Sequence, residues 1–302
     1  MHLAWRDRTY SKQIQRCRPN IYHETTMIGP RRRSSMPVVM TVYDLSLQRY
    51  PDLHPQDRAS HFNRFFRQRL QNVDHVLTLS EFVRQEFIEI FSWPSDRVTA
   101  VALAVDAVFS PRPQESVSNL RLRYRLPEQY LLFVGAREPR KNLPQLLAAM
   151  KEMQNPLDLV CVGPTGWHAH EFERAIELLG LRPRIIVLES CADNELALLY
   201  SGAIALVYPS LYEGFGLPVL EAMACGCPVV CSDRGSLPEV VGSAAIQVSL
   251  LDTGSLVRAL DQVTQDEHLG VDLRQRGLKR AAQFSWEDTA RRTLAVFEHV
   301  SM

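Results

Sequence analysis

Residues 204–232 read IALVYPSLYEGFGLPVLEAMACGCPVVCS, and this stretch decides the fold class. The apolar runs Ile204–Tyr208 and Val229–Cys231 predict two buried strands. A glycine-bearing loop and a short helix lie between them. This order of strand, loop, helix and strand is typical of a parallel α/β unit. The chain is therefore predicted to be an α/β protein.

The loop of this unit carries residues suited to binding a ligand. Gly214 and Gly216 allow the backbone to approach a ligand closely, and Pro218 suits the first turn of a helix. The N–H groups at the start of that helix favour a phosphate. Glu213 and Glu221 frame the loop, and carboxylates accept hydrogen bonds well from a vicinal diol. The pair suits the two sugars of a nucleotide diphosphate sugar, and the alternative is a tight turn with solvated glutamates.

The string EGFGLPVLEAMACGCPVV, residues 213–230, resembles the E-x7-E signature of the retaining glycosyltransferases of family 4. That family has the GT-B fold, in which two Rossmann-like domains face a cleft. The resemblance implies that Glu213 meets the donor sugar and that Glu221 meets the nucleotide ribose. It also implies donor contacts from the backbone of four loop residues, which are Gly214, Phe215, Gly216 and Leu217.

The composition is that of a globular protein. With 302 residues, of which 46% are hydrophobic and 23% charged, the chain can bury a large core. No apolar run reaches the length of a membrane span, and Met1–Trp5 is followed by arginines rather than by a signal peptide. We therefore expect a cytoplasmic protein. Cys225, Cys227 and Cys231 have no matching His or Cys pair at zinc spacing, so we expect reduced thiols and no metal.

The net charge is zero, but its distribution is uneven. Residues 1–112 carry 16 Lys and Arg against 11 Asp and Glu. They include Arg31–Arg33 and the stretch HFNRFFRQRL at 61–70, where aromatic residues and arginines alternate at helical spacing. One interpretation is peripheral contact with the inner face of an anionic membrane. The other is an amphipathic helix packed on its own domain. No nucleic-acid-binding motif is present, so nucleic acid is not an expected partner.

The N-terminal half offers two further candidate catalytic residues. Val38–Tyr43 predicts a buried strand, and at its end the family commonly has a histidine that faces the donor sugar. This sequence has Tyr43 there, and a tyrosine is not a base near neutral pH. His23, at the end of a short predicted strand, is the other candidate. A structural hydrogen bond is the alternative role for a histidine in that place.

A second group of candidates follows the predicted strand Tyr130–Gly135. The sequence continues AREPRKN, and cations at the carboxyl end of a strand can neutralise a diphosphate leaving group. A solvated turn of charges is the alternative. The family resemblance, here to members that read EPRKN, assigns this role to Lys141, with Arg140 or Arg137 as its partner. Gly135 and Arg137 are also expected to contact the donor.

We expect three segments along the chain. Residues 1–112 form a truncated, acceptor-side Rossmann-like domain, because family members have further strands before Tyr22. Residues 113–284 form the nucleotide-sugar-binding domain, and residues 285–302 a helix that crosses back to the first domain. The segment Ser110–Ser118, rich in proline and polar residues, is the predicted hinge.

The resemblance implies a retaining glycosyltransferase. It would move a hexose, with GDP-mannose as the best guess for the donor, to a glycan or lipid-linked acceptor. The acceptor hydroxyl would attack on the face that the diphosphate leaves, without a metal or other cofactor. Two alternatives stand beside this hypothesis. One is a truncated nucleotide-sugar-binding remnant, and the other is a GT-B sugar-nucleotide epimerase.

Overall fold

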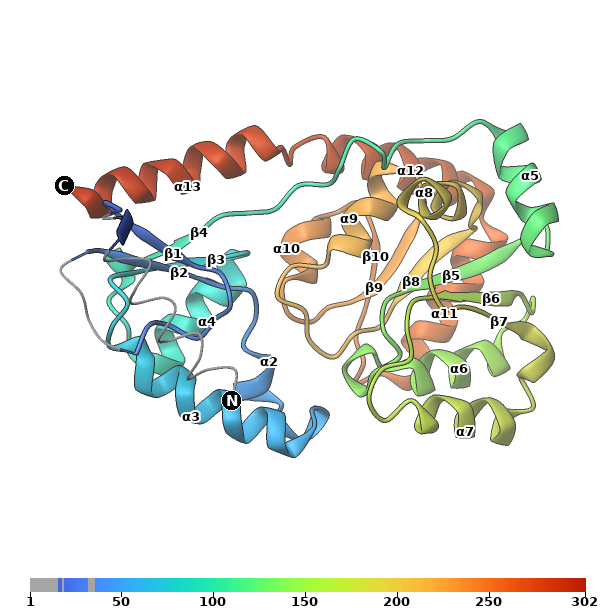
Figure 1. The fold of residues 1–302 in the computed structure, drawn as a ribbon. Coiled ribbons are helices and arrows are strands. Elements are labelled where there is room, and N and C mark those ends of the chain that lie inside the picture. The colour runs from blue at the N-terminus through green and yellow to red at the C-terminus, as the bar shows by residue number, and fades with distance from the viewer. Residues whose placement is uncertain (1–15, 18, 32–35) are drawn as a thin grey trace. The chain divides into compact units, whose positions relative to one another are not determined.

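The chain forms two compact units. The computed structural model describes residues 16–17, 19–31 and 36–302, so Met1–Trp5 and two of the arginines in Arg31–Arg33 lie outside the described residues. Unit 1 comprises Met1–Ala102 with Glu287–Met302, and unit 2 comprises Leu103–Trp286. Each unit is a parallel sheet with helices, which confirms the predicted α/β fold class (Figure 1).

The sheet of unit 1 is parallel throughout. Within the described residues it has four strands in the order β1-β2-β3-β4, which are β1 (Tyr22–Glu24), β2 (Val38–Val42), β3 (His75–Thr78) and β4 (Val98–Ala100). Both faces of β2 are buried. Val38 and Met40 belong to one core cluster and Val39 to another. A continuous apolar run is what a strand covered on both faces requires.

Helices cover both faces of this sheet. The helical segments that the structure describes in unit 1 are α2 (Ser46–Arg49), η1 (Pro51–Leu53), α3 (Gln56–Leu70), α4 (Glu81–Phe91), η2 (Ser95–Arg97) and α13 (Trp286–Ser301). Phe66 of α3 and Phe87 of α4 share a cluster with Val38, while Val296 of α13 packs with Val39 on the other face. The last helix of the chain therefore completes the core of unit 1.

Helix α3 is the basic, aromatic stretch singled out in the sequence. Its Phe62 and Phe66 are buried in unit 1, while Arg64 and Arg67 are exposed. The helix is thus amphipathic and packs on its own unit. Contact of its basic face with a membrane stays a prediction. Among the residues that the structure describes, no helix is long and apolar enough to cross a membrane.

The sheet of unit 2 is larger and is also parallel throughout. In residues 103–286, which are all described, its six strands run in the order β7-β6-β5-β8-β9-β10. They are β5 (Tyr130–Val134), β6 (Asp158–Val162), β7 (Ile185–Leu188), β8 (Ala205–Tyr208), β9 (Val229–Ser232) and β10 (Ile246–Val248). The order reverses between β5 and β8. In open parallel sheets, ligands bind outside the carboxyl ends of the strands at such a reversal.

Helices also flank the sheet of unit 2 (Figure 1). They are α5 (Gln114–Tyr124), η3 (Pro139–Lys141), α6 (Leu143–Glu152), α7 (His170–Leu179), η4 (Arg182–Arg184), α8 (Asp193–Gly202), α9 (Leu217–Ala224), α10 (Leu237–Val241), α11 (Thr253–Gln265) and α12 (Glu267–Ala281). The segment Ser110–Ser118, predicted as a hinge, is helical from Gln114 onward. Pro113 is the N-cap of this helix, and Val117 and Leu120 are buried, so the part of the segment from Gln114 onward is a packed helix of unit 2. The hinge itself stays a prediction.

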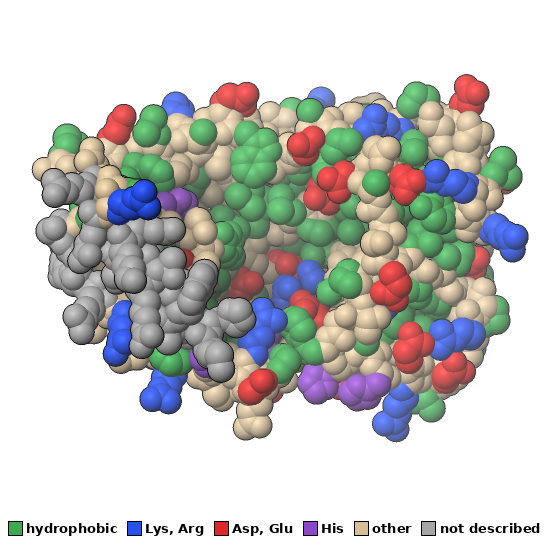
Figure 2. All heavy atoms as spheres, viewed as in Figure 1, with side chains coloured by type: hydrophobic (Ala, Val, Ile, Leu, Met, Phe, Trp, Pro, Cys, Tyr) green, Lys and Arg blue, Asp and Glu red, His purple; other side chains and the backbone are tan. Residues whose placement is uncertain are grey.

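The surface and the thiols of unit 2 are unremarkable for a globular protein. On the face drawn in Figure 2, its basic and acidic side chains are interspersed.

Cys225, Cys227 and Cys231 are buried and not in disulfides. Burial raises the pKa of each of these thiols to about 12. Buried thiols of this kind are small core residues rather than reactive groups.

Candidate active site

A cluster of buried charges lies where the strand order of unit 2 reverses. Lys141 ends the short helix η3 after β5, and Glu213 lies in the loop after β8. The Lys141 Nζ is 2.7 Å from Glu213 Oε1, and Arg140 Nη1 is 3.0 Å from Glu213 Oε2. Lys141 and Glu213 are each only 7% exposed. The neighbouring strands thus bring together residues that are far apart in the sequence.

The cluster holds its carboxylate ionised. Burial by itself raises the pKa of Glu213, but the charges of Lys141 and Arg140 outweigh it and lower that pKa to about 2. Burial lowers the pKa of Lys141 from its ordinary value, while the carboxylate of Glu213 acts in the opposite direction. A buried ion pair of this kind is costly to break, because either partner alone would be an unpaired charge away from water.

Arg140 is held from two sides. Its Nη1 donates to the carbonyl oxygen of Tyr212 at 2.7 Å, and its Nη2 donates to Glu138 Oε1 at 2.6 Å. The backbone N–H of Leu211 donates in turn to the carbonyl oxygen of Arg140 at 2.8 Å. The loops after β5 and β8 are therefore tied by backbone and side-chain bonds. Sequence reasoning missed Glu138, which brings a second carboxylate beside the two cations.

Tyr208, the last residue of β8, was also missed. Its hydroxyl accepts a hydrogen bond from Lys141 Nζ, and that nitrogen lies 4.6 Å from the centre of the tyrosine ring. Tyr208 is fully buried and stacks on Phe133 of β5, with ring centroids 6.1 Å apart. The signal available in the sequence was its place at the carboxyl end of a buried strand beside the signature loop. Tyr208 thus holds the ammonium group of Lys141 in place through its hydroxyl and its ring.

The signature loop is fixed by its own backbone and by Ser236. Gly216 caps α9 with φ of 103°, and a Cβ atom there would lie 2.7 Å from Leu237 Cδ2. Only glycine suits such a position. The hydroxyl oxygen of Ser236 lies 3.0 Å from the carbonyl oxygen of Glu213 and 2.8 Å from that of Phe215, so its single proton can be shared between these two acceptors. Four predicted donor contacts lie together in this loop and at the start of α9, namely Gly214, Phe215, Gly216 and Leu217.

Glu221 lies in α9 and has a different environment. Its Oε2 accepts a hydrogen bond from the hydroxyl of Tyr200 at 2.9 Å. Tyr200 belongs to α8 and is fully buried. Burial raises the pKa of Glu221, although the bond from Tyr200 acts in the opposite direction. Tyr200 therefore orients this carboxylate, and no motif in the sequence points to Tyr200.

Arg137 and Gly135 lie in the loop that leads to Lys141. Arg137 is 4% exposed, and it donates to the carbonyl oxygen of Gly163 and to Thr165 Oγ1, both at 2.6 Å. It also pairs with Glu189 at 2.6 Å, so it fastens the loops after β6 and β7. Arg140, not Arg137, is the arginine that shares Glu213 with Lys141. Gly135 has φ of 142°, and a Cβ atom there would lie 3.5 Å from Lys141 Cε.

The two N-terminal candidates belong to unit 1. His23 lies in β1, where its Nε2 is 2.8 Å from Thr41 Oγ1 and its ring meets Phe297 edge-on at 5.2 Å. Burial lowers the pKa of His23, while Glu24 raises it. Tyr43 follows β2 and is 41% exposed. The contacts described for His23 are with residues of unit 1, and the catalytic roles of His23 and Tyr43 stay predictions.

The comparisons with known proteins agree with this architecture. Residues 121–282 match the family model described as glycosyl transferases group 1, and residues 2–109 match the model of glycosyltransferase family 4. O-antigen chain mannosyltransferase B of Escherichia coli is 35% identical over 300 residues, which are 98% of this chain and 76% of that protein. The serotype-specific mannosyltransferase WbdA of Escherichia coli is 34% identical over 76% of this chain, although the match spans only 29% of WbdA.

A solved structure supports the fold. Sucrose-phosphate synthase from Thermosynechococcus elongatus superposes with a TM-score of 0.80 at 23% identity, over 97% of this chain and 77% of that one. The GT-B fold expected from the sequence is confirmed by this likeness. Since both family models match, one of them over more than half of the chain, the protein belongs to glycosyltransferase family 4 and is a glycosyltransferase.

Proposed function

We propose that this glycosyltransferase moves mannose from GDP-mannose to a glycan or lipid-linked acceptor, with retention of the anomeric configuration. Two of its relatives are named as mannosyltransferases, one of them acting on an O-antigen chain. The proposal extends their sugar and their class of product to this chain. Assembly of a surface polysaccharide of the O-antigen type is the corresponding process.

The buried cluster of Lys141, Arg140 and Glu213 carries this proposal. It lies at the carboxyl edge where the strand order reverses, which is where an open sheet binds nucleotides. Lys141 has three N–H groups, of which Glu213 and Tyr208 accept two. The third can meet a phosphate oxygen. Such a fixed cation stabilises the charge that grows on a departing diphosphate.

The reaction needs positioned charges rather than a protein nucleophile. The acceptor hydroxyl attacks the anomeric carbon on the face that the diphosphate leaves, so one C–O bond forms as the other breaks. The hydroxyl proton passes to an oxygen of the leaving diphosphate. Lys141 and Arg140 supply the positive charge for this step. We therefore propose that transfer requires no metal ion, and that activity persists after chelation.

The two glutamates hold the two ends of the donor in this proposal. Glu213 is ionised at neutral pH and accepts hydrogen bonds from hydroxyls of the transferred sugar. Glu221, oriented by Tyr200, accepts bonds from the ribose diol. The N–H groups at the start of α9 lie between these two residues in the chain and suit the diphosphate.

A donor screen tests the proposal. The purified chain is incubated with GDP-mannose, UDP-glucose or UDP-galactose and a mannose-terminated lipid-linked acceptor, and the product is followed by mass spectrometry. We expect transfer from GDP-mannose and its loss in Lys141→Met. Lys151→Met, at an exposed lysine of α6, is the matched control. An inverted anomer in the NMR spectrum of the product would overturn retention.

Two other outcomes distinguish the remaining hypotheses. Saturable donor binding without transfer to any acceptor would favour the nucleotide-sugar-binding remnant. A new sugar released from donor alone would favour the epimerase.

Peripheral membrane contact is proposed separately, because a lipid-linked acceptor lies in a membrane. The exposed Arg64 and Arg67 of α3 are the residues that would meet anionic lipid. Sedimentation with vesicles that contain phosphatidylglycerol tests this. We expect binding to weaken in the Arg64→Gln, Arg67→Gln double variant, and equal binding by both chains would refute this role of α3.

A further inference from the structure

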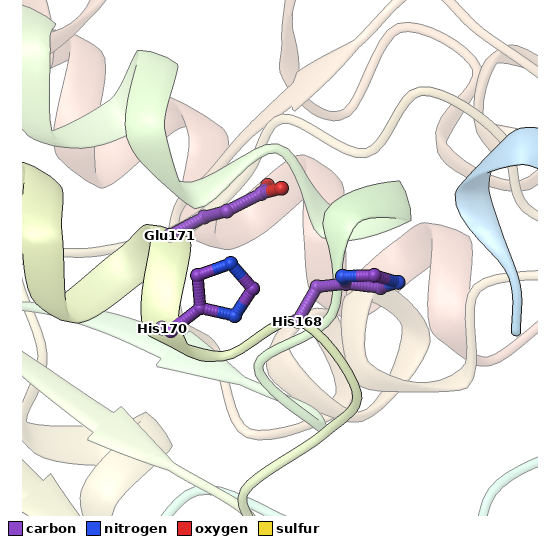
Figure 3. A group of neighbouring side chains, drawn as sticks. All are labelled: His168, His170 and Glu171. Atoms are coloured by element: carbon purple, nitrogen blue, oxygen red, sulfur yellow. The ribbon is translucent and has the colours of Figure 1, made fainter.

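Three side chains with metal-binding atoms gather at the start of α7 in unit 2. His168 lies in the loop before this helix, and His170 and Glu171 are its first two residues. One ligand atom of each lies within 4.8 Å of the ligand atoms of the other two, and all three side chains are exposed (Figure 3). None of them belongs to the cluster around Lys141 described above.

The backbone brings these side chains together. Residues two apart on a regular helix face different sides, so His168 and His170 would diverge if α7 began earlier. His168 instead has the left-handed conformation, with φ of 57°, and its carbonyl oxygen accepts a hydrogen bond from the Glu171 N–H at 3.0 Å. The two imidazole rings consequently lie with their centroids 5.8 Å apart. Left-handed backbone is uncommon for a residue other than glycine, and it is retained here where the ligand atoms converge.

Two imidazoles and one carboxylate are a known ligand set of zinc, with the fourth position open to water. Tetrahedral bonds of about 2.0–2.2 Å place ligand atoms roughly 3.4 Å apart. Because the three side chains are exposed, rotation about their own bonds can close the remaining distance without repacking of the core. Imidazole also selects zinc, copper and nickel over magnesium and calcium, which prefer oxygen ligands.

The electrostatics at this helix end permit a cation. The start of a helix is its positive end and by itself disfavours a metal ion. Glu171 and Glu173 both lie in the first turn of α7, but Glu173 is paired with Arg182 at 2.6 Å, so the counter-charge beside the two histidines is that of Glu171. The carboxylate of Glu171 therefore serves both as a ligand and as a counter-charge.

We infer that His168, His170 and Glu171 form a binding site for one divalent transition metal ion of the zinc class, completed by water. None of these three residues is among the candidate residues for sugar transfer. Its structural effect is to join the start of α7 to the loop after β6. That loop also contains Thr165, which Arg137 holds.

Calorimetric titration of the untagged, EDTA-stripped chain with ZnCl2 tests this inference. Four variants are compared with the wild type, namely His170→Ala, Glu171→Gln, the double variant His168→Ala, His170→Ala, and His268→Ala as the matched control. His268 is an exposed histidine on α12 of the same unit. Trp167 adjoins His168, so quenching of tryptophan fluorescence by Cu2+ gives a second readout. Circular dichroism checks that each variant is folded.

We expect one Zn2+ per chain, unchanged in His268→Ala and absent from the double variant. Loss of a single ligand should weaken binding by about 10- to 100-fold or more, because even outer partners of metal ligands have effects of that size. MgCl2 should give no binding at the same site. Equal Zn2+ affinity in the double variant and the wild type would overturn the site, and so would the lack of saturable binding to the wild type. Transfer activity is not the readout, so this test is independent of the proposed function.

Discussion

The two glutamates of the signature have opposite electrostatic environments although they are eight residues apart. Glu213 is buried between Lys141 and Arg140, whose charges lower its pKa to about 2 against the effect of burial. Glu221 has the neutral hydroxyl of Tyr200 as its partner, and burial raises its pKa.

The difference shows what decides the charge of a carboxylate in this motif. Glu221 lies in the middle of the helix α9 (Leu217–Ala224), beyond its first turn, so the helix dipole does little to favour its negative charge. Burial is the largest influence on the pKa of Glu221, and the charge of Asp193 also raises it. Glu213 lies before the helix, and the loop after β5 brings two cations to it. The loop after β5, not the motif itself, sets the ionisation of Glu213, whereas burial dominates at Glu221.

The largest expected effect is on the free energy of unfolding, which substitution of Glu213 should lower far more than substitution of Glu221. Glu213→Gln leaves Lys141 and Arg140 without their shared carboxylate and should lower the free energy of unfolding by about 3–5 kcal/mol at neutral pH. Glu221→Gln keeps an oxygen that can accept the bond from Tyr200, so it should cost about 1 kcal/mol or less. Urea-induced unfolding of both variants measures this, and equal losses would break the comparison.

The pH dependence of stability should have opposite signs at the two sites. The pKa of Glu213 falls from 4.5 to about 2 on folding, so the unfolded chain binds more protons in that window. Its stabilising contribution, about 3 kcal/mol, is present above pH 4.5 and is lost as the pH falls towards 2. The pKa of Glu221 is raised on folding, so its contribution is lost as the pH rises above 4.5.

Subtraction isolates these two contributions from those of other carboxylates. The unfolding free energy of the wild type minus that of Glu213→Gln should shrink on acidification below pH 4.5. The same difference for Glu221→Gln should shrink as the pH rises above 4.5. Two slopes of the same sign would contradict the assignment of environments.

Tyr208→Phe tests how Tyr208 supports Lys141, whose charge lowers the pKa of Glu213. The change keeps the ring beside Lys141 but removes the hydroxyl that accepts its N–H. An unsatisfied buried donor costs about 1–3 kcal/mol. Under the proposed function the basic limb of the pH–rate profile should also move to lower pH, because the ammonium form loses a partner. Phe133→Leu, which alters packing beside Tyr208 but removes no hydrogen-bond acceptor of Lys141, is the control and should leave that limb in place.

Tyr200→Phe should have the smallest effect. It removes one hydrogen bond to Glu221 and should weaken binding of the nucleotide by about 2- to 10-fold, in line with about 0.5–1.5 kcal/mol for such a bond. Calorimetric titration with GDP measures this, with transfer measured at saturating donor as a second readout. Under the proposed function, a rate that saturating donor fails to restore would mean that Tyr200 does more than orient Glu221 towards the ribose.

Local sequence signals predicted the elements that hold the site. The apolar runs at Tyr130–Val134 and Ala205–Tyr208 are strands, and the loop from Glu213 leads directly into α9 as its glycines and proline indicate. These features follow from burial and backbone conformation within a few residues. Strands and turns of this kind can be predicted from one segment of the sequence alone.

Contacts between strands that are distant in the sequence could not be predicted in the same way. The stretch AREPRKN left both Arg140 and the out-of-register Arg137 open as partners of Lys141, and the adjacency of β5 and β8 selects Arg140. Tyr208 looked like an ordinary core residue because its neighbours in sequence are apolar. Its hydroxyl has a polar role only because Lys141, in the short helix η3 after β5, lies beside it.

Helix α13 determines the order in which the units can mature during synthesis. Its Val296 covers Val39 and Leu77 of the unit 1 sheet, yet the ribosome makes these residues before the whole of unit 2 and makes Val296 after it. Unit 2 can close while the nascent sheet of unit 1 still exposes an apolar face. A chaperone that recognises such a face would therefore act on the N-terminal residues until the last helix emerges.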